Sequence, residues 1–120
     1  MENSIKGYSL KSSSEFSELR QSGRKIFTSS GLLFKYKKNN LNHLRVGWTV
    51  PKYIGSAVRR NKLKRWGREA CRINSDLKKL PIDVNVIFLR RFKDNIHSFK
   101  FTSVEQCFDE FYKKVSDTKI

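Results

Sequence analysis

A run of basic residues in the middle of the chain has the composition best suited to chemistry. Seven lysines and arginines lie between Arg59 and Arg72, and Glu69 is the only acid among them. Like charges four residues apart repel on a helix, so a helix with no use for them would carry interspersed glutamates. Cationic side chains that contact nucleic-acid phosphates release condensed counterions, which favours binding. The run therefore predicts a phosphate-binding surface rather than a merely solvated helix face.

The overall composition supports a polyanionic partner. The 120 residues contain 26 Lys and Arg against 11 Asp and Glu, a formal net charge of +15. Hydrophobic residues make up 38% and aromatic residues 12%, which is enough for a core and excludes a disordered basic tail. A charge this large exceeds what an enzyme of small anionic metabolites needs. We expect one domain that binds nucleic acid.

Signals for other kinds of chemistry are weak. His43 and His97 are isolated, and no nucleophile motif, glycine-rich phosphate loop or metal-ligand spacing is present. Cys71 and Cys107 lack zinc-site spacing, so we expect buried, reduced thiols. No apolar run approaches the roughly 18 residues of a membrane span, and no signal peptide is visible. These features favour a cytoplasmic binding protein that does not contact a membrane.

The hydrophobic periodicity predicts an α+β fold, a two-layer α-β sandwich in the order α-β-β-β-α-β-α. Ser12 and Glu15 form a capping box before a short helix, which we expect to end with a left-handed Gly23. A second capping box at Thr102 and Glu105 opens the last helix. The remaining expected elements are strands at 25–28, 32–36, 44–50 and 82–89, and a helix at 55–73.

The helix at 55–73 has two contrasting faces. At 100° per residue, the arc with Leu63, Trp66, Ala70 and Ile73 is expected to be buried. Gly67 lies near the edge of this arc, and we expect it to allow close packing on the sheet. The opposite arc carries the polar and basic residues Arg60, Asn61, Lys64, Arg65, Arg68 and Arg72.

Aromatic side chains form a second candidate site. Phe16 on the first helix, with Phe34 and Tyr36 on the second strand, is expected to border one groove. Aromatic platforms beside lysines bind single-stranded nucleic acid by stacking, worth ~1–3 kcal/mol per base. Aromatic residues of a small sandwich more often belong to the core, so both interpretations remain open from the pattern alone.

The sequence RVGWTVPKYIGSAVRRNKLKR over residues 45–65 closely resembles the signature of the bacterial ribonuclease P protein subunit family. The resemblance extends to residues 14–23 and 32–34, to the chain length and to the final amphipathic helix, and covers about residues 8–115. It departs from the family pattern at Lys62, where an arginine is usual, and at Pro51, Tyr53, Arg20 and Gly67.

This resemblance implies an accessory protein without catalytic residues of its own. In the family, a large RNA subunit with bound Mg²⁺ removes the 5′ leader of precursor tRNA by hydrolysing one phosphodiester. The implied partners are this RNA subunit and precursor tRNA, with one monomeric protein per RNA. The family fold includes a left-handed β-α-β crossover. We expect a single RNA-binding domain over residues 1–120, with loose ends at 1–7 and 116–120.

The resemblance, together with the basic run and the aromatic pattern, gives the expected site residues. Those expected to bind the RNA subunit are Lys52, Arg59, Arg60, Asn61, Lys62, Lys64, Arg65, Arg68 and Arg72. Those expected to line a cleft for the single-stranded leader are Phe16, Arg20, Phe34 and Tyr36. The alternative is a ribosomal or other structural RNA-binding protein, and the lack of an acid–base pair disfavours an independent RNA-cleaving enzyme.

Overall fold

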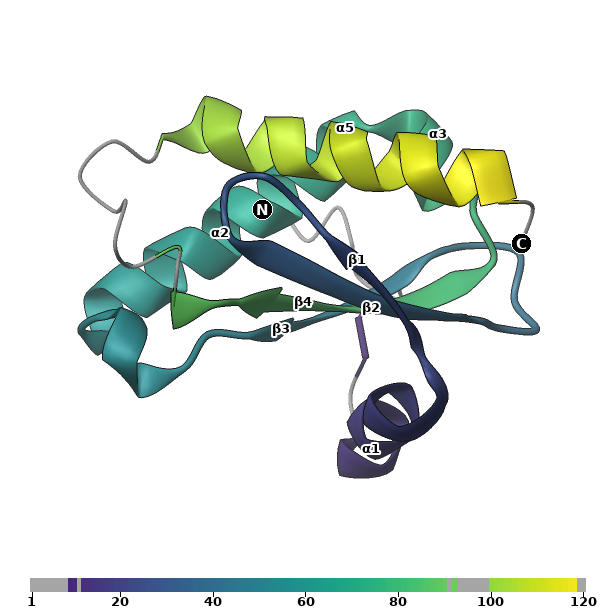
Figure 1. Ribbon diagram of the computed structural model, residues 1–120, viewed down its shortest axis with the longest axis horizontal. Helices are drawn as coiled ribbons and strands as arrows, with labels where there is room; N and C mark the ends of the chain where they lie inside the picture. Colours follow the sequence, from purple (N-terminus) through teal and green to yellow (C-terminus); the bar gives the residue numbers. More distant parts are fainter. Residues whose placement is uncertain (1–8, 11, 91, 93–99, 119–120) are drawn as a thin grey trace.

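One four-stranded mixed sheet organises the molecule, whose computed structural model describes residues 9–10, 12–90, 92 and 100–118. The strands lie in the order β1-β2-β4-β3, with β1–β2 and β2–β4 antiparallel and β3–β4 parallel (Figure 1). Gly31 has φ +93°, the left-handed conformation that the turn between β1 and β2 requires. The strands are β1 Arg24–Phe27, β2 Leu32–Lys38, β3 Arg45–Thr49 and β4 Ile82–Phe88.

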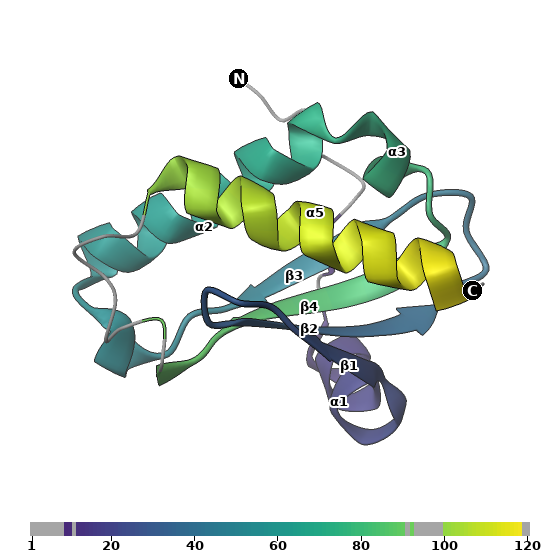
Figure 2. The same cartoon turned by 45° about the horizontal axis from the view of Figure 1, so that its top comes forward.

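Helices cover the two faces of the sheet unequally. Figures 1 and 2 show α2 and α5 together on one face, whereas α1 lies on the other. The predicted α+β class and element order are confirmed, with α1 on the second face. Among the described elements, η1 and α3, which lie before and after α2 in the chain, were not predicted. The helical elements are α1 Ser13–Ser22, η1 Lys52–Ile54, α2 Ala57–Ile73, α3 Ser75–Lys78 and α5 Phe101–Thr118.

The main core lies between the sheet and the α2–α5 layer. Alternate residues of each strand point to this face, and α5 adds the predicted apolar stripe. Phe34 is fully buried and stacks on Phe111 with ring centroids 4.4 Å apart. Both cysteines are buried and unpaired, as expected. Burial of each such aromatic side chain contributes ~1.5–3 kcal/mol. This face therefore supplies most of the stability.

The opposite face of the sheet, which we call the open face, has a smaller apolar contact with α1. Leu10, Leu19 and Leu33 are buried but lie outside the main core cluster. The strand register aligns the residues of this face in rows across the sheet. One row contains Phe27, Leu33, Ile87 and Thr49, the next contains Lys25, Lys35, Asn85 and Gly47, and the third contains Lys37, Asp83 and Arg45.

The orientation of α2 differs from the sequence expectation. Ile73 is 49% exposed, and the buried face centres on Leu63, Gly67 and Ala70. The reason is Gly67, where any Cβ would overlap the Trp48 ring of β3. The predicted close packing at Gly67 is therefore confirmed, and it rotates Ile73 away from the core.

Three predicted helix boundaries also needed correction. The Ser12–Glu15 capping box is present, but Gly23 is extended at φ −74° because the chain passes directly into β1. The helix α5 begins at Phe101, one residue before the expected cap Thr102. The same helix continues to Thr118, so residues 116–118 are helical instead of loose. The expected loose segment 1–7 lies outside the described residues.

Candidate nucleic-acid interface

The N-terminal half of α2 concentrates positive charge where a helix tolerates it least. Ser56 caps the helix, its Oγ accepting the Arg59 N–H at 3.3 Å, and the first turn contains no acid. Cations near a helix N-terminus oppose the helix dipole, and lysines and arginines four residues apart repel one another. This arrangement costs stability in the free protein, and a bound polyanion would remove the cost.

The nine residues expected to bind the RNA subunit lie on α2 and at Lys52, just before it. Among the described residues, Arg72 is the one of these nine with a carboxylate partner, Glu69. This pair lowers the pKa of Glu69 and raises that of Arg72. Arg60 and Lys64 are half-buried. The exposed members are Lys52, Arg59, Asn61, Lys62, Arg65, Arg68 and Arg72.

Two members of the set are oriented by local contacts. Arg60 Nε donates to the Gly55 carbonyl at 3.2 Å, and the residue is half-buried. The Lys62 ammonium lies 5.0 Å from the Trp66 ring centroid, a cation–π contact. These two contacts orient the side chains of Arg60 and Lys62 along the surface of the helix.

Phe16 lies where the leader cleft was expected, on the open face. Its ring packs directly against the backbone of Gly47 on β3, because a Cβ at Gly47 would overlap the ring. Phe16 is half-buried, so part of the ring is accessible. Arg20 lies one helical turn later, is exposed, and donates from Nη2 to Ser17 Oγ at 2.9 Å. An aromatic ring and a guanidinium thus lie on the same side of α1.

The prediction that Phe34 and Tyr36 border this groove is wrong. Phe34 is 0% and Tyr36 is 5% exposed, and both contact Phe111 of α5. The strand alternation sends them to the face opposite α1, so the sheet itself separates them from Phe16. Their neighbour Lys35 lies on the α1 side instead.

Three residues of the open face were missed at the sequence level. Lys25 and Phe27 of β1 and Lys35 of β2 alternate with core residues, and Ile26, between the first two, packs against the main core. The period-two pattern that marks Phe34 as a core residue also assigns its neighbours to the other face. The missing information was which of the two faces α1 covers.

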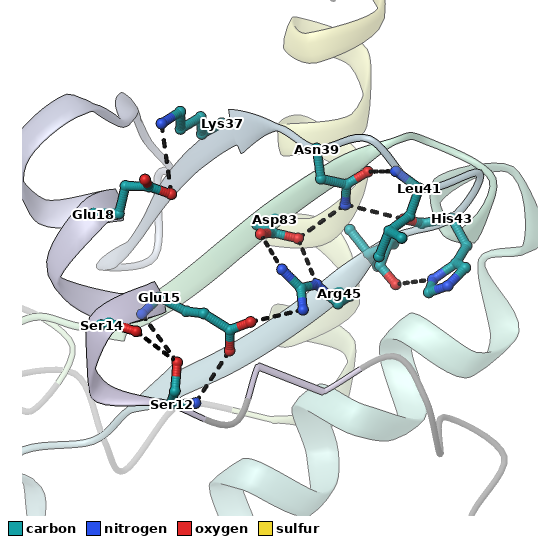
Figure 3. Close-up of polar contacts among 11 residues, drawn as sticks. Ser12, Ser14, Glu15, Glu18, Lys37, Asn39, Leu41, His43, Arg45 and Asp83 are labelled. Atoms are coloured by element: carbon teal, nitrogen blue, oxygen red, sulfur yellow. Dashed lines mark hydrogen bonds and ion pairs between the residues drawn. The ribbon is translucent and has the colours of Figure 1, made fainter.

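The position of α1 on the sheet is fixed by Arg45, which bridges α1, β3 and β4 (Figure 3). Arg45 Nε and Nη2 donate to the two carboxylate oxygens of Asp83 at 2.9 and 2.7 Å. Its Nη1 donates to Glu15 Oε2 at 2.7 Å, while Glu15 Oε1 accepts the Ser12 N–H at 3.1 Å. Asn39 Nδ2 donates to Asp83 Oδ1 at 2.9 Å. These bonds raise the pKa of Arg45, with Asp83 the largest cause.

Other residues with catalytic potential are placed in structural roles. Burial raises the pKa of Cys71 and of Cys107, which makes both thiols poor nucleophiles. His43 is half-buried, with its Nδ1 2.9 Å from the Leu44 carbonyl, and His97 lies outside the described residues. Among the described residues, no group of three or more His, Cys, Asp or Glu side chains is placed to hold a metal ion. No described helix is long and apolar enough to span a bilayer.

Comparison with known proteins identifies the family. Residues 5–116 match the family model described as Ribonuclease P. The ribonuclease P protein component of Fusobacterium nucleatum is 31% identical over 104 residues, covering 87% of this chain and 93% of that protein. The protein component from Lactobacillus helveticus is 33% identical over 102 residues, covering 84% of this chain and 80% of the relative.

Solved structures agree with the sequence comparison. The ribonuclease P protein of Thermotoga maritima superimposes with a TM-score of 0.79 at 26% identity, covering 88% of this chain and 96% of that one. The Staphylococcus aureus ribonuclease P protein gives a TM-score of 0.75 at 25% identity, covering 88% and 93%. The chain belongs to the ribonuclease P protein component family, the accessory protein subunits of the ribonucleoprotein endoribonuclease ribonuclease P.

Proposed function

We propose that this protein docks on the ribonuclease P RNA through α2 and holds the 5′ leader of precursor tRNA on the open face of its sheet. The RNA subunit then hydrolyses the phosphodiester that joins leader and tRNA. One monomeric protein binds each RNA, and the complex works in the cytoplasm. The protein acts by position and charge, and supplies no reacting group.

The observation that carries this proposal is the exposed basic surface of α2. From Arg59 to Arg68, six basic side chains lie on two and a half turns of helix with no carboxylate partner among the described residues. Such an array attracts phosphates along an RNA backbone, and each contact releases counterions. The docking residues are Lys52, Arg59, Arg60, Asn61, Lys62, Lys64, Arg65, Arg68 and Arg72.

The leader is the substrate element that fits the open face. Phe16 offers part of an aromatic ring for stacking on a base, and Arg20 and Lys35 provide positive charge for neighbouring phosphates. Mature tRNA lacks the leader, so these contacts stabilise only the complex with precursor. Phe34 and Tyr36 stabilise the sheet from the other side and have no direct contact with the leader.

Mg²⁺ belongs to the RNA in this proposal. The described residues offer no carboxylate cluster for it, and the surface of α2 is strongly cationic. The bound ion would supply the activated water and the leaving-group stabilisation for phosphodiester hydrolysis. Neutralisation of RNA phosphates by α2 lowers the concentration of free cation needed to fold the RNA core.

A reconstitution experiment tests this function. Precursor tRNA is incubated with the protein alone, with bacterial ribonuclease P RNA alone, and with both at low Mg²⁺. We expect cleavage at the leader junction only in the mixture. Cleavage by the protein alone, or the same rate with and without protein, would overturn the proposal.

Matched charge variants separate α2 from a general effect of positive charge. Arg68→Gln should weaken binding to the RNA subunit and reduce the slope of log K against log salt by about one. Lys113→Gln removes an equal charge from the exposed side of α5, and should leave the slope unchanged. Equal effects of the two variants would show that α2 is not a specific docking surface.

A parallel pair of variants tests the leader contact. Phe16→Ala should weaken binding of precursor and leave binding of mature tRNA unchanged, since mature tRNA does not reach the open face. Leu41→Ala removes an exposed apolar side chain from the loop between β2 and β3, outside α2 and the rows of the open face, and is the control. Equal losses for precursor and mature tRNA would assign Phe16 a structural role.

A further inference from the structure

Phe27 is an exposed aromatic residue that the predicted site does not include. It is 55% exposed, and it is the one aromatic side chain among the large hydrophobic residues that the described part of the chain leaves exposed. An apolar ring of this size in contact with water forgoes a substantial part of its burial energy. It lies on β1, an edge strand of the sheet, and β3 forms the opposite edge.

The strand register places Phe27 on the open face, together with α1. Phe27 pairs with Leu33, which pairs with Ile87, which in turn pairs with Thr49 of β3. Side chains of paired residues point to the same side of a sheet. One row therefore crosses all four strands, from Thr49 on β3, the strand against which Phe16 packs, through Ile87 and Leu33 to Phe27 at the outer edge.

Two lysines lie in the neighbouring row beside Phe27. Lys25 and Lys35 face one another directly across β1 and β2. Like charges directly opposite on an antiparallel pair destabilise it. Neither lysine has a carboxylate partner among the described residues. A bound phosphate between the two ammonium groups would offset this repulsion.

We propose that Phe27, Lys25 and Lys35 form a second contact for single-stranded RNA, in which a base stacks on Phe27 and its phosphate lies near the lysines. An aromatic ring beside unpaired cations is the composition that binds single-stranded nucleic acid without sequence preference. The surface is continuous with the site of Phe16, so the occupant is an upstream part of the same leader. This inference rests on the proposed function.

The width of the sheet determines which leader nucleotides reach Phe27. Three strand spacings of about 4.8 Å separate β1 from β3, roughly 14 Å. One nucleotide cannot contact both Phe16, over β3, and Phe27, on β1. The base on Phe27 must therefore lie several positions upstream of the base at Phe16, and short leaders end before it.

A leader-length experiment tests this contact in the reconstituted holoenzyme. Binding is measured for precursors with leaders of about two and about ten nucleotides, using wild-type protein, Phe27→Ala and the exposed control Leu41→Ala. We expect Phe27→Ala to weaken binding of the long-leader precursor about five- to tenfold, the lower part of the range for one stacked base. Binding of the short-leader precursor should not change, and Leu41→Ala should affect neither.

The alternative outcomes are distinct. Equal losses at both lengths, or no loss at either, would overturn the contact at Phe27. Phe27→Trp should retain the length dependence and Phe27→Leu should lose it, because stacking requires a ring. Failure of the proposed function itself looks different: wild-type protein would then bind long-leader precursor, short-leader precursor and mature tRNA equally.

Discussion

Replacing Arg45 by methionine is the sharpest test of how α1 is held on the open face. Methionine keeps much of the volume and removes three charge-assisted bonds, two to Asp83 and one to Glu15. The change leaves two carboxylates facing each other without a cation between them. We expect the helix to lose its fixed position while the main core, on the other side of the sheet, stays intact.

The structure sets the size of the effect. Removing one partner of a fully buried pair costs 3–5 kcal/mol. The side chains of Arg45, Glu15 and Asp83 are 25%, 27% and 16% exposed, so solvent screens part of the interaction. The expected loss in the free energy of unfolding is about 2–3 kcal/mol, measured by urea denaturation followed by circular dichroism.

Matched variants make the test of Arg45 decisive. Lys113→Met removes a cation from exposed α5 and should change the free energy of unfolding by less than about 0.5 kcal/mol. Adding Asp83→Asn to Arg45→Met should recover part of the loss, because one of the two unpaired charges disappears. If Arg45→Met costs no more than Lys113→Met, the bridge does not hold α1 on the sheet.

The remaining predictions concern the core. Gly67→Ala should lower the free energy of unfolding by about 1–3 kcal/mol, measured by thermal or urea denaturation, because the added Cβ overlaps the Trp48 ring. This loss outweighs the better helix propensity of alanine. A neutral or stabilising result would show that α2 can move away from β3. Burial raises the pKa of Cys71 and Cys107, so native protein at pH 8 should react with iodoacetamide far more slowly than unfolded protein, as measured by mass spectrometry. Above about pH 8.5 the unfolded state loses thiol protons that the folded state keeps, so stability should fall by up to about 1.4 kcal/mol per pH unit for each thiol, and Cys→Ala variants should lose that slope.

The elements were predictable because each has a local cause. The capping box at Ser12, the alternation in residues 32–36 and the apolar stripe of the last helix are readable from neighbours a few positions apart. The basic face of α2 was equally predictable, because a helical-wheel projection of residues 55–73 separates its charged residues from its apolar residues. The short helix α3 was not predicted, because four residues carry no periodic signal.

The candidate site was less predictable because it depends on which elements meet. The alternation of side chains along a strand predicts that Phe34 and Lys35 point to opposite faces of the sheet. No local pattern, however, indicates that α1 covers the face that contains Lys35. That choice comes from long-range contacts such as Glu15 with Arg45, 30 residues apart in the chain. The orientation of α2 likewise depends on the Trp48 ring beside Gly67, a contact between two elements.

The two faces of the sheet divide stability from binding. The face under α2 and α5 holds the main aromatic core, and this core stabilises a helix whose own charges oppose its folding. In the part of the chain that the structure describes, the open face is covered by α1, with a few leucines and the Arg45 bridge, and Phe27 stays exposed. Because the sheet separates the two functions, residues of the open face, such as Phe27 and Lys35, can vary with little effect on the core. Changes in leader binding should therefore arise from substitutions on the open face, and changes in RNA-subunit binding from substitutions on α2.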